Sequence, residues 1–301
     1  MKGTLYLILC GIFLGTIGIW VKLIGSSVSP FLLTILRVAI ASVMVLLLII
    51  FTKNMKTLET LEMKKKNLLP FIIAGFFGVT IGFGFFIKSF SYIPVSNAVI
   101  LMYVYPLVTA FLSWIFLKEK ITRLEIIALI LVLVGVWSIY GSEMNLQANT
   151  FGNILALISG CGYSVFFVFM RYFEKRGMPY WKVTFWPLVI GGLMLTLLLP
   201  TESFIFSPVH SVPIWIFGLA FFTFLGYIFY AKGLNTIRAH NAVITVSLTE
   251  PLTAIVLALI ILSESIPQYV YVGGALIIFA NILVGREHKK KKLNINNIKS
   301  S

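Results

Sequence analysis

The chain has 301 residues, of which 59% are hydrophobic and only 11% are charged. Soluble domains contain about 25% charged residues, so this composition excludes an ordinary water-soluble enzyme and indicates a protein that lies mostly in lipid. Both cysteines lie in apolar runs and no aspartate is present, which argues against a disulfide framework, a cysteine metal site and aspartate-pair chemistry.

Apolar segments of nearly equal length follow one another along the whole chain. A hydrocarbon core of ~30 Å needs about 20 helical residues. In chain order, the predicted spans are residues 4–21, 31–51, 69–87, 98–117, 124–140, 151–170, 183–199, 213–231, 242–262 and 269–284. We therefore predict an all-α integral membrane protein with ten transmembrane helices and no separate soluble domain.

The positive charges predict how these spans are oriented. Loops rich in lysine and arginine stay on the cytoplasmic side. If the N-terminus is cytoplasmic, nearly all of the 24 lysines and arginines fall on that side, and only Lys22 and Lys88 face outward. We expect a multi-pass plasma-membrane protein with both termini in the cytoplasm. The net charge of +14 then reflects topology and the basic tail, residues 286–301, which can bind anionic lipid, so no nucleic-acid partner is needed.

The two halves of the chain resemble each other. Residues 82–100 match residues 226–244, including Asn97 with Asn241, and the step from Pro106 to a glutamate thirteen residues later recurs after Pro251. A weaker match pairs Gly3 and Gly11 with Gly152 and Gly160. Five spans separate the copies, and because five is odd the second copy crosses the membrane in the opposite sense. We predict inverted five-helix repeats at residues 1–142 and 143–285, followed by the tail, an arrangement that is typical of alternating-access transporters.

Several of these features together resemble the EamA family of the drug/metabolite transporter superfamily. They are the ten spans, the five-plus-five duplication, the Pro-to-Glu spacing in spans four and nine, and Leu36-Arg37-Val38-Ala39 early in span two. The resemblance implies a transporter whose spans four and nine line the path. Similar proteins are associated with export of amino acids, other metabolites and toxic compounds, and relatives carry nucleotide sugars, sugar phosphates or lipid-linked sugars.

Glu250 is the main candidate for a functional residue. It lies inside a predicted span, about 12 Å deep at 1.5 Å per residue. A carboxylate at that depth costs on the order of 3 kcal/mol, so it should be protonated, paired with a cation or facing water. Each arrangement would suit proton coupling or binding of an amine, and a purely structural hydrogen bond is the alternative. Tyr105 is its counterpart in the first half.

Pro106 and Pro251 lie within spans four and nine and each removes a backbone donor. The carbonyl freed by each proline must find another partner or face water, so we expect both prolines to bend their helices around a central cavity, with simple packing kinks as the alternative. Tyr103, Tyr163 and Tyr227 lie inside spans, where hydroxyls or ring faces can meet a ligand.

The remaining candidates each have a structural and a functional interpretation. Lys88 and Lys232 end spans three and eight, and they either extend to the interfaces or point inward to receive a carboxylate or phosphate. Asn97 and Asn241 open spans four and nine as helix caps or as cavity residues. Arg37 fits the family pattern and is assigned a structural role.

The sequence thus favours a secondary active transporter, not an enzyme, that couples proton movement to efflux of a small amphipathic metabolite such as an amino acid or organic amine, as an antiporter. A lipid-linked sugar flippase, a sugar-phosphate or nucleotide-sugar carrier and, less well supported, a passive channel are the alternatives. The three histidines are too scattered for catalysis. No cofactor or metal is expected, and a monomer is preferred over a homodimer.

Overall fold

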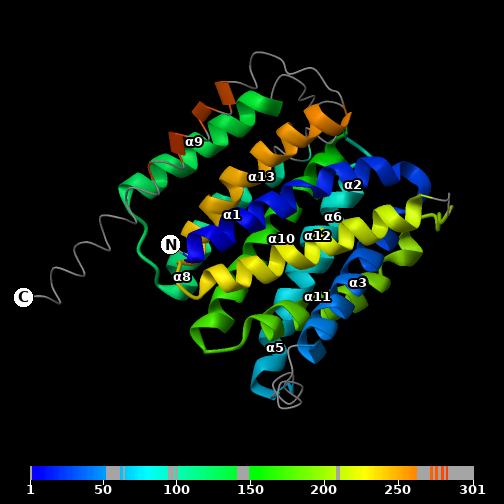
Figure 1. Cartoon of the computed structure of the whole chain (residues 1–301), viewed down its shortest axis with the longest axis horizontal. Helices are drawn as coiled ribbons and strands as arrows, with labels where there is room; N and C mark the ends of the chain where they lie inside the picture. The colour runs from blue at the N-terminus through cyan, green and yellow to red at the C-terminus, as the bar shows by residue number, and fades with distance from the viewer. Residues whose placement is uncertain are drawn as a thin grey trace, which may run out of the picture.

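A bundle of long helices makes up the part of the chain that the computed structural model describes (Figure 1). The described residues are 2–51, 62–63, 65–93, 98, 101–140, 149–207, 211–262, 272–273, 275–276, 279–280 and 283. Within these ranges no strand forms, and the backbones of Val28 and Phe206 make one isolated antiparallel bridge. The all-α prediction is confirmed for this part of the chain.

Helices lie on the first nine predicted spans. Their bounds are α1 (Lys2–Gly15), α2 (Ile17–Ile24), η1 (Gly25–Ser27), α3 (Pro30–Phe51), α5 (Lys65–Ile73), η2 (Ala74–Gly84), α6 (Phe85–Ser89), α8 (Tyr105–Leu117), α9 (Arg123–Tyr140), α10 (Thr150–Lys175), α11 (Tyr180–Thr196), η4 (Leu199–Thr201), α12 (Val212–Leu234) and α13 (Ala239–Leu262). The tenth predicted span, 269–284, lies mostly outside the described residues, so the count of ten stays a prediction.

The length and apolarity of the helices indicate that the protein spans a membrane. Five helical stretches are long and apolar enough to cross a bilayer: Lys2–Ser27, Pro30–Phe51, Lys65–Ser89, Thr150–Lys175 and Val212–Leu234. Large apolar side chains also lie on the outside of the bundle, among them Phe116, Leu193 and Ile214. An outer surface of this kind is stable in lipid, where apolar side chains need no burial. The chain is therefore a multi-pass membrane protein.

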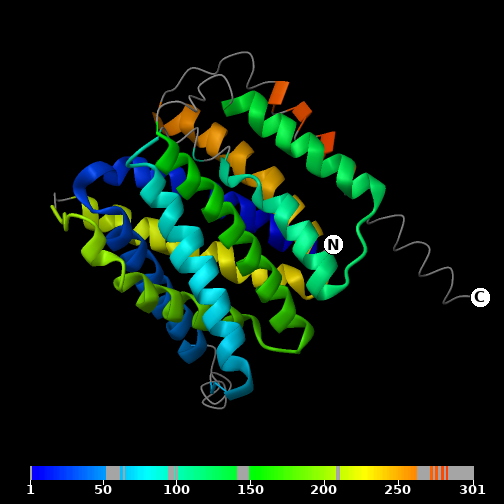
Figure 2. The same cartoon turned by 180° about the vertical axis from the view of Figure 1, so that it is seen from behind.

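Two helical segments each pack between two neighbouring helices. α1 packs against both α12 and α13, and it lies between them in Figure 1. The π-helical segment η2, which continues directly from α5, packs against α10 and α11, seen from behind in Figure 2. α3 contacts α11 and α12, while α8 contacts α10 and α13. Helices distant in the sequence thus meet along their lengths around one core.

Glycines set the closest helix contacts. A methyl group on Gly162 of α10 would lie 2.8 Å from the Gly82 nitrogen of η2. One on Gly11 of α1 would lie 3.0 Å from the carbonyl oxygen of Val246 in α13, and one on Gly160 would lie 2.6 Å from that of Met102. Such distances leave no room for a side chain, so these backbones approach as closely as small residues permit.

The two prolines that the sequence pairs differ in their surroundings. The chain turns at Tyr103 and Val104, and α8 begins at Tyr105, so that Pro106 is its second residue. Proline fits this position because the first amides of a helix lack intrahelical partners. Pro251, in contrast, lies inside α13, which continues on both sides of it. The two prolines were expected to interrupt their helices in the same way, but Pro106 lies at a helix start and Pro251 lies within a helix.

Candidate functional site

A small cavity lies at the centre of the bundle. Its volume is about 10 Å³, and it is lined by Leu14, Ile17, Met102, Tyr105, Tyr163, Phe167, Tyr227 and Glu250. This is roughly the space that a single water molecule requires. The helices have therefore closed around the polar centre, and any metabolite needs the bundle to open before it can enter.

Glu250 brings the acidic group to this cavity. It projects from α13, beside the Tyr105 hydroxyl of α8 and within electrostatic reach of Arg37 on α3. Tyr105 is the counterpart of Glu250 in the repeat, so the two halves contribute different polar groups to the same place. The structure thus places Glu250 at the cavity, in agreement with its depth in the predicted span.

Arg37 is the buried cation of the site. Its side chain is 0% exposed, its Nε donates to Thr223 Oγ1 of α12 at 2.7 Å, and its guanidinium lies 5.1 Å from the centre of the Phe83 ring. Its Nη1 and Nη2 atoms make no hydrogen bond of normal geometry within the described ranges, although the Tyr163 hydroxyl lies close by. Sequence analysis predicted a structural role for Arg37, and no sequence pattern pointed to Thr223.

Aromatic rings surround these charges. Tyr227 stacks on Phe83 with centroids 5.1 Å apart and planes 9° from parallel, and Tyr163 contacts Phe83 at 5.0 Å. Tyr103 packs against Tyr105 at 5.5 Å and is not among the cavity-lining residues. Of the predicted tyrosines, Tyr163 and Tyr227 therefore line the cavity together with Glu250. Tyr103 packs against the cavity residue Tyr105.

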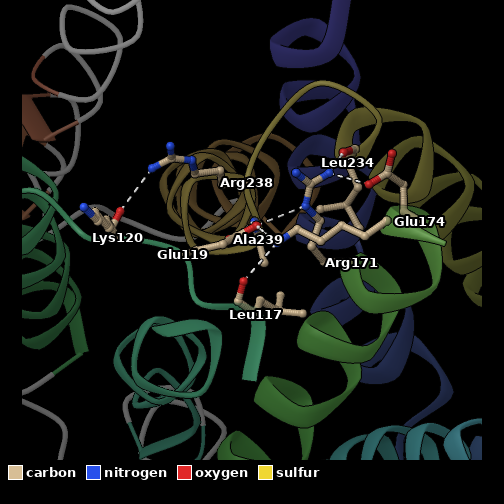
Figure 3. Close-up of polar contacts among 9 residues, drawn as sticks. Leu117, Glu119, Lys120, Arg171, Glu174, Leu234, Arg238 and Ala239 are labelled. Carbon is tan, nitrogen blue, oxygen red and sulfur yellow. Dashed lines mark hydrogen bonds and ion pairs between the residues drawn. The ribbon is translucent and has the colours of Figure 1, made fainter. Parts of the chain in front are cut away.

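A cluster around Glu119 closes one end of the bundle (Figure 3). Glu119 follows α8 and its side chain is 4% exposed. One carboxylate oxygen accepts from Arg171 Nε and from Lys175 Nζ, both of α10 and both at 3.2 Å, and the other accepts from the Ala239 amide at the start of α13 at 3.1 Å. A carboxylate at a helix N-terminus is favoured by the helix dipole, and bonds between charged groups are the stronger ones.

Further bonds join this Glu119 cluster to neighbouring segments. Arg171 Nη1 also donates to Glu174 and to the Leu234 carbonyl at the end of α12. Arg238 Nη1 donates to the Lys120 carbonyl at 3.1 Å. The ends of α8, α10, α12 and α13 are consequently held together by a single set of charged groups.

A second carboxylate, Glu202, joins segments at the other end of the bundle. It accepts from the Phe31 amide at the start of α3 at 2.9 Å and from the Leu32 amide at 3.4 Å. Lys88 Nζ at the end of α6 donates to it at 3.0 Å. Like Glu119, Glu202 is a buried carboxylate that pairs with a cation and accepts from the amides of a helix N-terminus. We call Glu202, Phe31, Leu32 and Lys88 the Glu202 cluster.

The two predicted lysines lie over aromatic rings away from the cavity. Lys88 Nζ is 5.3 Å from the centre of the Phe31 ring, and Lys232 Nζ is 4.7 Å from that of Tyr180. Phe31 and Tyr180 are near the first residues of α3 and α11, so the two lysines have corresponding surroundings. In this conformation neither lysine lines the cavity.

Asn241 is the third residue of α13 and is buried, with an Oδ1 atom that has no hydrogen-bond partner within the described residues. The first amide of α13 is held by Glu119 instead. Asn97 lies outside the described residues. The sequence flagged Glu119 only through its repeated spacing from Pro106, and nothing in the pattern identified Glu202.

Helices that could span a bilayer, closed around a charged and aromatic centre, define a multi-pass membrane transporter as the class of protein. The chain belongs to the EamA-like transporter family, whose profile matches residues 1–141 and 150–286. The resemblance expected from the sequence is thus confirmed.

Similar proteins are transporters by name. An uncharacterized transporter from Clostridium kluyveri is 27% identical over 96% of this chain and 94% of its own length. One from Archaeoglobus fulgidus is 25% identical over 95% and 97%, and YyaM, an uncharacterized transporter of Bacillus subtilis, is 27% identical over 73% of each chain. A solved crystal structure superposes with a TM-score of 0.80 over 96% of this chain and 98% of the other at 17% identity, which establishes a shared fold.

Proposed function

We propose that the protein is a secondary active transporter of the plasma membrane that exports a small amphipathic metabolite, such as an amino acid or organic amine, in exchange for protons by alternating access. The observation that carries this proposal is the position of Glu250, a carboxylate in a closed central cavity with Arg37 and tyrosine hydroxyls around it. A group that exchanges a proton for a ligand must be shielded from both sides at once in part of the cycle, and the cavity supplies that shielding.

Repeated packing supports two inverted copies with a shared axis. A methyl group on Gly3 would contact the Ile237 side chain, and one on Gly152 would contact Ile93, its counterpart. Likewise, Gly11 meets the Val246 carbonyl and Gly160 meets the Met102 carbonyl, again at equivalent positions of the repeat. Each copy's first helix therefore packs on the other copy in the same way, as a pseudo-twofold axis requires.

The cavity lies where such an axis would pass. Phe83 and Tyr227 are equivalent in the repeat and stack on each other, while Tyr105 and Glu250 are equivalent and are neighbours at the cavity. Residues that meet their own counterparts lie at the axis. Relative movement of the two copies would then open the cavity to one side or to the other.

The Glu119 and Glu202 clusters are suited to act as the two gates. Each joins helix ends through a buried carboxylate, and the predicted topology places the Glu119 cluster at the cytoplasmic side and the Glu202 cluster outside. Charged hydrogen bonds contribute about 1.5–3 kcal/mol each, an energy that a modest rearrangement can exchange between states. With both clusters formed, the conformation described here is occluded.

Proton coupling is assigned to Glu250. The titratable and charged groups that face it from the helices packed around it are Cys10, Arg37, Tyr105, Tyr163 and Tyr227. None of these is a second carboxylate, so in this group a proton and a cationic ligand compete for Glu250 alone. Competition for one site is the simplest basis for exchange of a proton for an amine.

Glu250→Gln tests the proposal in proteoliposomes loaded with candidate amines and amino acids. The variant keeps the size of the side chain but holds no exchangeable charge, so flux driven by a pH gradient should fall to background while the melting temperature stays near that of the wild type. Glu62→Gln is the matched control, because it removes the carboxylate of an exposed residue outside the cavity and should leave the pH dependence in place. Unchanged pH-driven flux in Glu250→Gln would exclude Glu250 from coupling.

A further inference from the structure

Arg37 uses only part of its hydrogen-bonding capacity. Its guanidinium is fully buried and Nε is bonded to Thr223, but Nη1 and Nη2 have no acceptor of normal geometry among the described residues. A buried cation left unpaired is expensive, because the low-polarity interior does not replace its hydration. Two buried donors of this guanidinium thus remain available to an acceptor.

Thr223 fixes which end of the guanidinium remains available. Its hydroxyl donates to the Leu219 carbonyl at 2.6 Å, so a lone pair is left to accept from Arg37 Nε at 2.7 Å. Phe83 covers one face of the guanidinium. The planar group is thus held at one edge, and the Nη atoms form the free edge.

Two residues that line the cavity lie near this guanidinium. Tyr163 and Tyr227 both line the cavity, and both interact electrostatically with Arg37. Glu250 lies within electrostatic reach of Arg37, but no hydrogen bond of normal geometry joins the two side chains. An acceptor that enters a cavity enlarged toward Arg37 could therefore bond to both Nη donors.

We propose that Arg37 is the anion-binding residue of the transport site, that it takes a planar carboxylate of the substrate through both Nη atoms, and that Thr223 is the positioning residue that orients it. A guanidinium matches a carboxylate with two parallel hydrogen bonds, which a lysine cannot reproduce. The inference rests on the proposed function and narrows it, because it separates carboxylate-bearing substrates from simple amines.

The test measures thermal stabilisation of the purified full-length protein, since a ligand bound to the folded state raises its stability by mass action. The probes are L-leucine and 4-methylpentanoate, with L-leucinamide and 4-methylpentanamide as partners of the same shape that lack the carboxylate. We expect at least one acid to bind the wild type tenfold or more tightly than its amide. Equal binding of every acid and amide, or stabilisation by no acid, would overturn the proposal.

Variants of Arg37 and Thr223 test whether these two residues cause the preference for the acid over its amide. Arg37→Lys should abolish the preference for acid over amide. Thr223→Val should reduce that preference about tenfold, and Thr223→Ser should restore it, which is a result that a merely structural threonine would not give. Tyr230→Phe removes another buried hydroxyl outside the cavity and should leave the preference unchanged. If Arg37→Lys does not fold, Thr223→Val and Thr223→Ser still test the proposal. A preference that Thr223→Val does not change would contradict the positioning role.

Glu250→Gln separates this inference from the proposed function. If 4-methylpentanoate still binds to Glu250→Gln, while wild-type liposomes show no proton-driven flux, the anion site stands and proton-coupled transport fails. If amines bind and are exported with protons, but acids have no advantage that depends on Arg37, the transport function stands and the anion site fails.

Discussion

At the scale of single residues, several polar groups of the core have no hydrogen-bond partner in the part of the chain that the structure describes. Arg37 presents two unbonded nitrogens, and the hydroxyls of Tyr105, Tyr227 and Tyr230 have no hydrogen-bond partner of normal geometry within the described residues. Buried polar atoms without partners destabilise a fold by about 1–3 kcal/mol each. Tyr105 and Tyr227 line the cavity, whereas Arg37 and Tyr230 are not among its lining residues, so a role in binding and a role in packing can be tested separately.

Removing the hydroxyls of Tyr105 and Tyr230 should separate a role in transport from a role in stability. Both Tyr105→Phe and Tyr230→Phe keep the aromatic packing, so the free energy of unfolding should stay within about 1 kcal/mol of the wild type or rise slightly. Only Tyr105 lines the cavity beside Glu250. Flux measured across a pH series should therefore change its midpoint in Tyr105→Phe alone, and an equal change in both variants would contradict the placement.

At the scale of helices, close backbone contact takes the place of the hydrophobic effect. Lipid is as apolar as the interior, so helices associate through van der Waals packing and polar contacts. Gly162 and Gly82 bring α10 and η2 together, and Gly191 of α11 reaches Gly75 of the same helical stretch. These contacts hold η2 tightly between its two neighbours.

Alanine at Gly162 should expose this dependence. Its methyl group would lie 2.8 Å from the Gly82 nitrogen and 3.0 Å from the Gly82 Cα, both of which are backbone atoms that cannot turn aside. Overpacking of this kind costs about 1–3 kcal/mol, so the melting temperature of Gly162→Ala should fall measurably. Gly18→Ala is the control, because nothing lies within 4 Å of the added methyl group and its melting temperature should be unchanged or higher.

At the scale of the whole molecule, two charged clusters close a bundle whose centre has room for little more than a water molecule. The cavity of about 10 Å³ cannot admit a metabolite unless the side chains or helices around it move. The Glu119 cluster ties α8 to α10 and α13, while the Glu202 cluster ties α3 to α6. Weakening either cluster should therefore bias the molecule toward opening at that end.

Labelling of Cys10 can report this bias. Cys10 is buried in α1 near Glu250, and Cys161 is exposed and is replaced by serine to remove background. Loss of one charge-assisted bond shifts an equilibrium by about tenfold. Glu119→Gln should raise the rate of Cys10 labelling by an impermeant maleimide by about that factor from the cytoplasmic face, and Glu202→Gln from the outer face. Faster labelling from the same face in both variants would contradict alternating access.

Local patterns in the sequence were enough to predict that the protein lies in a membrane, which family it belongs to and approximately where its membrane spans lie. Length and apolarity are properties of a continuous segment, which is why helices lie on nine of the predicted segments within the described residues. Family membership followed from the same segments together with their duplication and was confirmed by the profile match.

Only the tertiary structure decided which polar residues meet. Arg37 and Thr223 are 186 residues apart and share a bond of 2.7 Å, and Glu202 reaches the start of α3 across 171 residues. Apolar side chains cover both the lipid-facing and the inward sides of these helices, so hydrophobic periodicity does not reveal which way a buried polar side chain points. That direction is set by how helices from both halves pack, and the packing created the charged cavity on which the proposed transport depends.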